Sequence, residues 1–126
     1  MNTLVREIKN FISDLEESGE NIKARFLFPP DFTGFKGHFP GRPVLPGVCK
    51  IQAVIAMLET WHQKNICIKE ISMAKFFAPV FDNQEIVVTT NKITGLPETS
   101  GGIKIKASVT SNGKKISDLQ LILTAS

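Results

Sequence analysis

The segment from Val48 to about Gln63 limits the possible folds most, because it predicts a helix that is apolar on nearly every side. One apolar stripe recurs at helical spacing, and further apolar residues widen it beyond the face of an ordinary surface helix: Ile51, Val54, Ile55 and Leu58, with Ala53, Ala56 and Met57 beside them. Such a helix has to be enclosed by other elements. A chain of 126 residues is long enough for this, since it can bury roughly 65–70% of its unfolded surface.

The segments after this helix predict what encloses it. Alternating or β-branched residues predict strands over 66–71, 75–81, 85–93, 103–111 and 115–124. Turn residues separate most of these segments, and Asn112-Gly113 is the clearest hairpin signal among them. A long buried helix followed by an antiparallel meander predicts an α+β architecture in which the sheet curls around the helix.

The residues before the apolar helix predict one further helix and one further strand. Apolar residues at steps of three and four predict an amphipathic helix over about 3–17, ended by the Ser18-Gly19 turn signal. Residues 22–28 alternate partly and predict a strand that stops at Pro29-Pro30. Since no internal repeat or low-complexity segment interrupts the chain, we expect a single domain over residues 1–126.

Composition and charge exclude several classes of protein. No apolar run approaches the ~18–20 residues of a membrane span, and the first residues lack a signal-peptide pattern, so we expect a cytoplasmic protein. The net charge of +3 comes from scattered residues without a nucleic-acid motif, which argues against nucleic-acid binding. Cys49 and Cys67 make no disulfide framework and are expected to be buried thiols. No metal-ligand spacing occurs, so we expect neither a metal nor another cofactor.

The loop before the apolar helix is the most informative motif. Four glycines and three prolines between Asp31 and Gly47 demand a tightly specified loop, and Pro46-Gly47 suits the start of the helix. Its sequence His38-Phe39-Pro40-Gly41-Arg42-Pro43-Val44-Leu45-Pro46-Gly47-Val48 resembles the hallmark of the β-hydroxyacyl-ACP dehydratases of fatty-acid synthesis, a family with the hotdog fold. Residues 74–80 are similar to a second family segment. The resemblance covers the chain from about Phe26 onward, and its motifs are long and ordered.

The chemistry of this motif follows from residue types. Removing water from a 3-hydroxyacyl thioester needs a base at C2, an acid at the C3 hydroxyl and donors at the thioester oxygen. His38 suits the base, because its unperturbed pKa lies near neutrality. The backbone amides of Gly47 and Val48, at a helix start oriented by Pro46, suit the oxygen. Phe39, Pro40 and Gly41 would shape the loop that holds the imidazole.

One position departs from the family pattern. The dehydratases carry Glu or Asp on the central helix five residues after the glycine that matches Gly47, and here that residue is Gln52. An amide can orient a water or a hydroxyl but cannot donate a proton as an acid. Two hypotheses remain: His38 performs both proton transfers while Gln52 orients the hydroxyl, or the chain is an impaired acyl-binding or partner subunit. A hotdog thioesterase is a third alternative.

The resemblance also implies partners. It implies an acyl substrate linked to acyl carrier protein or CoA, in fatty-acid or polyene-type synthesis, and a homodimer in which His38 of one subunit faces Gln52 of the other. A heterodimer and a higher oligomer stay open. Lys36, Lys50 and Arg42 are positioned to meet an acidic carrier protein, although each is individually expected to be a solvated surface residue.

Overall fold

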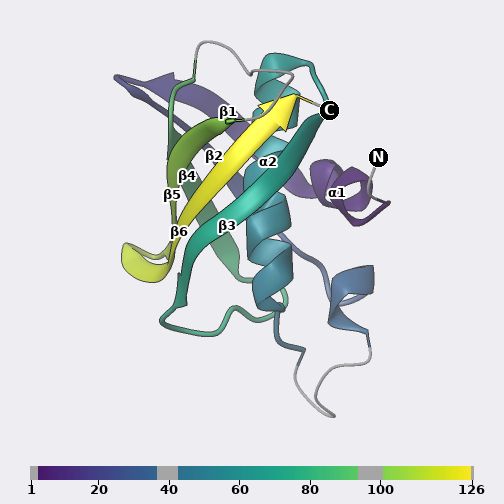
Figure 1. Cartoon of the computed structure of the whole chain (residues 1–126). Helices are drawn as coiled ribbons and strands as arrows, with labels where there is room; N and C mark the ends of the chain where they lie inside the picture. Colours follow the sequence, from purple (N-terminus) through teal and green to yellow (C-terminus); the bar gives the residue numbers. More distant parts are fainter. Residues whose placement is uncertain (1–2, 37–42, 94–100, 126) are drawn as a thin grey trace.

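The fold is one curved sheet around one long helix, as seen in a computed structural model that describes residues 3–36, 43–93 and 101–125 (Figure 1). The helix α2 (Gly47–His62) runs along the inner side of the sheet. The sheet has six strands in the order β1-β2-β4-β5-β6-β3. These strands are β1 (Ile12–Ser18), β2 (Asn21–Leu27), β3 (Ile66–Phe76), β4 (Glu85–Asn91), β5 (Ile103–Ser111) and β6 (Lys114–Ala125). Every neighbouring pair is antiparallel, so the expected α+β hotdog architecture is confirmed.

The core lies between α2 and the inner face of the sheet. Ten residues of α2 are buried. This extent of burial agrees with the enclosed helix that the sequence predicts. Alternate residues of the central strands point towards it, among them Ile86 and Val88 of β4 and Leu119, Leu121 and Leu123 of β6. This alternation fixes the register, because a slip by one residue would turn the apolar side chains outward.

The hairpin between β5 and β6 has the predicted turn. Asn112 and Gly113 adopt positive φ angles of 51° and 78°. Both central residues of a type I′ turn require such angles, which asparagine and glycine tolerate best. Ser111 then pairs with Lys114 across a two-residue loop, so this prediction is confirmed.

The predicted helix over 3–17 is wrong in its second half. Only Thr3–Ile8 form the helix α1, followed by a short 3₁₀ helix, η1 (Lys9–Phe11), and then by strand β1. The Ser18-Gly19 signal is a hairpin turn rather than a helix end, since Ser18 pairs with Asn21 and Gly19 has φ +61°. Pairing with β2 outweighs the helical periodicity here, because strand preference depends on neighbours more than on local sequence.

The two strands expected over 66–71 and 75–81 are also wrong as separate elements. Residues 66–76 form the single long strand β3, which stays paired with β6 through irregularities near Glu70 and Ser72. After Phe76 the strand ends, and Phe81 forms an isolated bridge with Val44 outside the named strands. Cross-strand pairing therefore carries β3 through a stretch that lacks a strand pattern of its own.

Within the described residues, no helix is both long and apolar enough to span a bilayer.

Candidate functional site

The start of α2 presents backbone amides that no N-cap side chain covers. Pro46 is the N-cap residue, with φ −61° and ψ 151°, and it makes no side-chain cap hydrogen bond. Its carbonyl accepts a hydrogen bond from the Cys49 amide at 3.0 Å. The first amides of an α-helix have no acceptor inside the helix. The Gly47 and Val48 amides therefore lie at the positive end of the helix dipole and suit a developing negative charge.

Phe76 of β3 packs directly over this helix start. A Cβ atom added to Gly47 would lie 2.9 to 3.2 Å from three atoms of the Phe76 ring. Glycine thus lets the ring approach the backbone of the first helical residue closely. Phe76 itself is about half exposed, at 47%. The sequence analysis did not identify this contact, and only the similarity of residues 74–80 to a family segment pointed towards it.

Gln52 lies one turn inside the helix on the same side as Val48. Residues four apart on an α-helix share a face and lie about 6 Å apart along the axis. Val48 is 53% exposed and Gln52 is half-buried, so this face of α2 is open at its start and becomes enclosed further along. A carboxamide in that position can accept and donate hydrogen bonds to a substrate hydroxyl.

The proposed base lies outside the described residues. His38, Phe39, Pro40, Gly41 and Arg42 all fall in the segment 37–42. The described residues on either side of it are tied to the rest of the fold. On one side, a Cβ added to Gly34 of η2 (Thr33–Phe35) would lie 2.8 Å from Cys49 Sγ, so η2 packs against the first turn of α2. On the other side, the Leu45 amide donates to the Val80 carbonyl at 2.7 Å.

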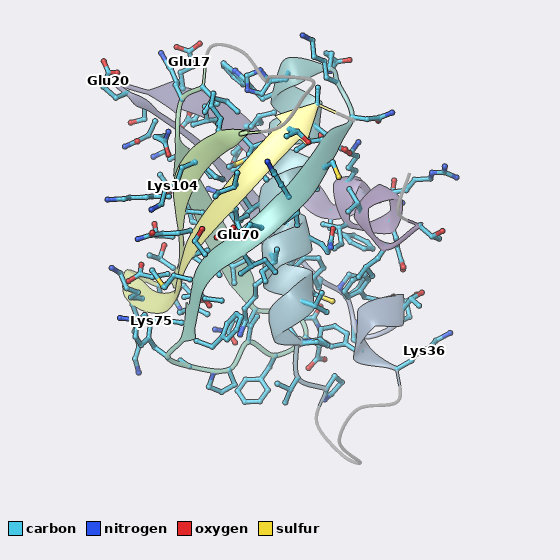
Figure 2. The ribbon with its side chains drawn as sticks, in the orientation of Figure 1. Glu17, Glu20, Lys36, Glu70, Lys75 and Lys104 are labelled. Atoms are coloured by element: carbon cyan, nitrogen blue, oxygen red, sulfur yellow. The ribbon has the colours of Figure 1, made fainter. Side chains whose placement is uncertain are left out.

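The helix α1 supports this arrangement. The Glu7 carboxylate of α1 accepts hydrogen bonds from the amide and the hydroxyl of Thr33, at 3.2 and 3.1 Å. Lys36, the last described residue before the segment 37–42, is exposed at the same end of the molecule as the start of α2 (Figure 2). Its expected solvation is confirmed.

The two cysteines differ, which corrects the expectation that both are buried. Cys49 is 1% exposed, and burial, with the nearby Glu7 carboxylate, raises its pKa to about 11. A thiol with that pKa is protonated at neutral pH and is a poor nucleophile. Cys67 lies on the edge strand β3 and is exposed.

Lys50 also departs from expectation, since it is a buried residue rather than a solvated one. Only 3% of it is exposed. Its ammonium lies 3.5 Å from the Ala78 carbonyl and 5.3 Å from the centre of the Phe76 ring. The apolar environment of the helix start thus encloses a cation that the sequence suggested would reach water.

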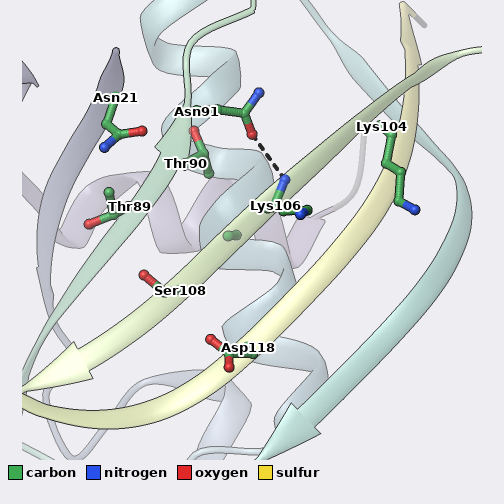
Figure 3. Close-up of a pocket in the computed structure, with 9 residues that line it drawn as sticks. Asn21, Thr89, Thr90, Asn91, Lys104, Lys106, Ser108 and Asp118 are labelled. Atoms are coloured by element: carbon green, nitrogen blue, oxygen red, sulfur yellow. Dashed lines mark hydrogen bonds between the residues drawn. The ribbon is translucent and has the colours of Figure 1, made fainter. Parts of the chain in front are cut away.

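A groove of about 540 Å³ lies elsewhere, on the side of the sheet away from α2 (Figure 3). It forms where β4 and β5 end their pairing, and the Asn91 side chain accepts the Lys106 amide at 3.0 Å in place of a strand partner. Mostly polar side chains line it, including Asn21, Thr89, Asn91, Lys106, Ser108 and Asp118. It shares no lining residue with the helix start and is therefore a separate feature.

No group of three or more potential metal ligands comes together among residues 3–36, 43–93 and 101–125.

A family model and two known proteins with similar sequences are described as dehydratases. The chain matches the model of the ApeI-like family, described as ApeI dehydratase, over residues 14–114. It is 34% identical over 84 residues to the 3-hydroxyacyl-acyl-carrier-protein dehydratase FabZ of a Wolbachia strain from Drosophila simulans, covering 60% of this chain and 57% of that protein. It is 31% identical over 64 residues to the FabZ of Ehrlichia chaffeensis, covering 47% and 45%. The chain thus spans about half the length of these relatives.

Solved structures confirm the fold. The dehydratase heterocomplex ApeI:P from Xenorhabdus doucetiae matches with a TM-score of 0.72 and 20% identity, over 90% of this chain and 96% of that chain. Mouse thioesterase superfamily member 2 matches with a TM-score of 0.61 and 12% identity, over 99% and 98%. At these identities the structures establish architecture alone. The sequence match over most of the chain establishes more, and the chain belongs to the ApeI-like dehydratase family.

Proposed function

We propose that the protein dehydrates a (3R)-hydroxyacyl thioester on acyl carrier protein to the 2-enoyl thioester, in the cytoplasm and within fatty-acid or polyene-type synthesis. The observation that carries this proposal is the uncapped start of α2, with Gln52 one turn further along the same face, in a chain of a dehydratase family. The FabZ relatives act on substrates of this class by name, which supports the choice of acyl carrier protein.

In the proposed reaction, the amides of Gly47 and Val48 bind the thioester oxygen. His38 removes the C2 proton, and the electron pair of that C–H bond forms the enolate, whose negative charge the amides stabilise. The enolate then forms the C2–C3 double bond as the C3–O bond breaks. The proton on His38 passes to the departing hydroxyl, which leaves as water.

Gln52 orients the hydroxyl in this scheme. Its carboxamide has no proton to give as an acid, so a single imidazole transfers the proton from C2 to the oxygen. Both positions then have to lie on the same side of the substrate. Losing a dedicated acid lowers a rate by roughly 10²–10⁴-fold, so we expect slow turnover from this chain alone.

We propose that the site is completed by a second subunit. β3 is an edge strand, and an unpaired edge with apolar side chains favours association. Four of the large apolar residues that are about half exposed lie on β3, just after it or at the start of α2: Val48, Ile71, Phe76 and Phe77. A second copy, or a related subunit that carries the missing acid, would cover them.

The amide at position 52 also favours a second candidate function, that of an acyl-binding partner of an active dehydratase. Purified wild type, His38→Ala and Gln52→Glu should be compared for formation of 2-enoyl thioester from 3-hydroxyacyl-ACP, followed by mass spectrometry. Dehydration proceeds in the wild type and falls at least 100-fold in His38→Ala if the main proposal holds. Turnover that begins only with Gln52→Glu supports the partner function. Release of free fatty acid from acyl-CoA, without enoyl product, would identify a thioesterase.

A further inference from the structure

Lys50 places a positive charge in the protein interior, where a charge destabilises the folded state. Its side chain is almost completely buried, and in the part of the chain that the structure describes its ammonium contacts the Ala78 carbonyl and the Phe76 ring. Among the residues described in the structure, no carboxylate lies within ion-pair distance of it. A buried charge without an opposite charge is expensive, and the contacts here only partly compensate for it.

The position on the helix adds to this penalty. Lys50 lies in the first turn of α2, where the helix dipole repels cations and attracts anions. Burial lowers the pKa of Lys50, while the neighbouring Cys49 opposes that shift. An aliphatic residue of similar length would fill the same space without either penalty, so stability of the fold does not explain a lysine here.

The Phe76 ring links the Lys50 charge to the backbone that binds the thioester oxygen in the proposed reaction. Gly47 and Lys50 are three residues apart and therefore share a face, about 4.5 Å apart along the helix axis. The Phe76 ring covers both, because it contacts the backbone of Gly47 and faces the Lys50 ammonium. Because Lys50 is only 3% exposed, its charge is screened less than a surface charge and acts more strongly on neighbouring groups.

We propose that Lys50 strengthens anion binding at the start of α2, so that this site selects acyl ligands whose head group carries or develops negative charge. This inference rests on the proposed function, in which that head group is the enolate of the thioester. Lys50 acts through space on the oxygen held by the Gly47 and Val48 amides and does not itself take part in proton transfer. Two unit charges about 8 Å apart at an effective dielectric of 20 change an equilibrium about 30-fold.

The test compares Lys50→Met with the wild type, using Lys104→Met as control. Methionine keeps the length and the apolar contacts of the lysine stem but removes the charge. Lys104 is exposed on the outer side of the sheet and takes no part in the helix start (Figure 2). Binding of decanoate and decanol, measured by calorimetry, reports the preference for a negatively charged head group. Thermal unfolding reports the effect on the fold.

We expect the wild type to bind decanoate more tightly than decanol, and Lys50→Met to reduce that ratio by about 10- to 30-fold. We also expect Lys50→Met to raise the melting temperature, because it removes a buried charge that the dipole repels. Lys104→Met should leave both quantities unchanged. Lys50→Gln keeps hydrogen-bond donors but removes the charge, so it should also lose the preference for decanoate over decanol. This variant replaces Lys50→Met in the test if the methionine variant fails to fold.

An unchanged binding ratio in either variant, or a wild type without the preference, overturns the proposal. A lower melting temperature with an unchanged ratio would identify Lys50 as a structural residue. The two proposals fail separately. If the charge preference depends on Lys50 but no enoyl thioester forms, the anion site stands without the dehydration. If the wild type dehydrates its substrate and Lys50→Met does so equally well, the dehydration stands without a role for Lys50.

Discussion

Glu59 fastens the far end of α2, and its removal should destabilise the protein strongly. Its side chain is only 5% exposed, and Oε2 accepts a hydrogen bond from the Ile66 amide, the first of β3, at 2.7 Å. Oε1 lies 2.8 Å from the Lys9 ammonium of η1, in an ion pair without the alignment of a hydrogen bond. One carboxylate thus joins the helix to an edge strand and to the N-terminal segment.

The expected loss for Glu59→Ala is the sum of two effects. Leaving the buried Ile66 amide unpaired costs about 1–3 kcal/mol. Losing the ion pair adds about 1 kcal/mol, a value reduced for solvent because the Lys9 side chain is 27% exposed. We therefore expect about 3 kcal/mol in total, out of the ~5–15 kcal/mol that stabilises a domain. Glu59→Gln keeps an acceptor for the amide and should lose only about 1–2 kcal/mol.

Urea unfolding at a fixed protein concentration measures both variants. With a slope of about 1.5 kcal/mol per molar urea, Glu59→Ala should lower the midpoint by about 2 M and Glu59→Gln by about 1 M. Lys9→Met serves as the matched control, because it removes the ion pair and keeps the acceptor for Ile66. The reasoning is refuted if Glu59→Ala loses less than about 1 kcal/mol, or if the glutamine variant loses as much as the alanine variant.

The remaining predictions concern thiol reactivity and pH. In the folded protein at pH 8, a chromogenic disulfide reagent should modify Cys67 but not Cys49. One thiol per chain should therefore react before unfolding and two after it. A folded Cys67→Ser variant that still reacts would contradict this prediction. Burial, together with Lys64, lowers the pKa of His62, so the unfolded chain binds more protons than the folded one below about pH 6.5, the ordinary value for histidine. Stability should therefore decrease as the pH falls below 6.5, and His62→Gln should flatten that part of the profile; identical profiles for the two proteins would exclude His62 as the cause.

The sequence predicts the central part of this fold well because burial determines it. The apolar residues of α2 occur on every side of the helix, and only an enclosed helix accommodates them. The Asn112-Gly113 turn is equally predictable, since few other residue pairs adopt two positive φ angles. Both features depend on properties of the residues themselves.

The wrong predictions concern elements that depend on neighbours far away in the chain. Residues 12–18 follow a helical spacing, yet β2 offers them an unpaired edge, and Asp14 accommodates an irregularity there with φ +51°. The burial of Lys50 depends on Phe76 and Ala78, which lie on and just after β3. Apart from the similarity of residues 74–80 to a family segment, the sequence around each residue contains no signal of these contacts, because they arise only when the sheet closes around the helix.

The use of main-chain donors at the start of α2 has a consequence for how such proteins diverge. Substitution of a side chain leaves an amide N–H in place, unless the new residue is proline. A side-chain acid, by contrast, is removed by a single substitution, and position 52, where the family resemblance implies Glu or Asp, is Gln in this chain. If the proposed function holds, binding of the acyl head group depends on the main chain and its conversion depends on side chains, so a substitution can remove the second while it leaves the first in place.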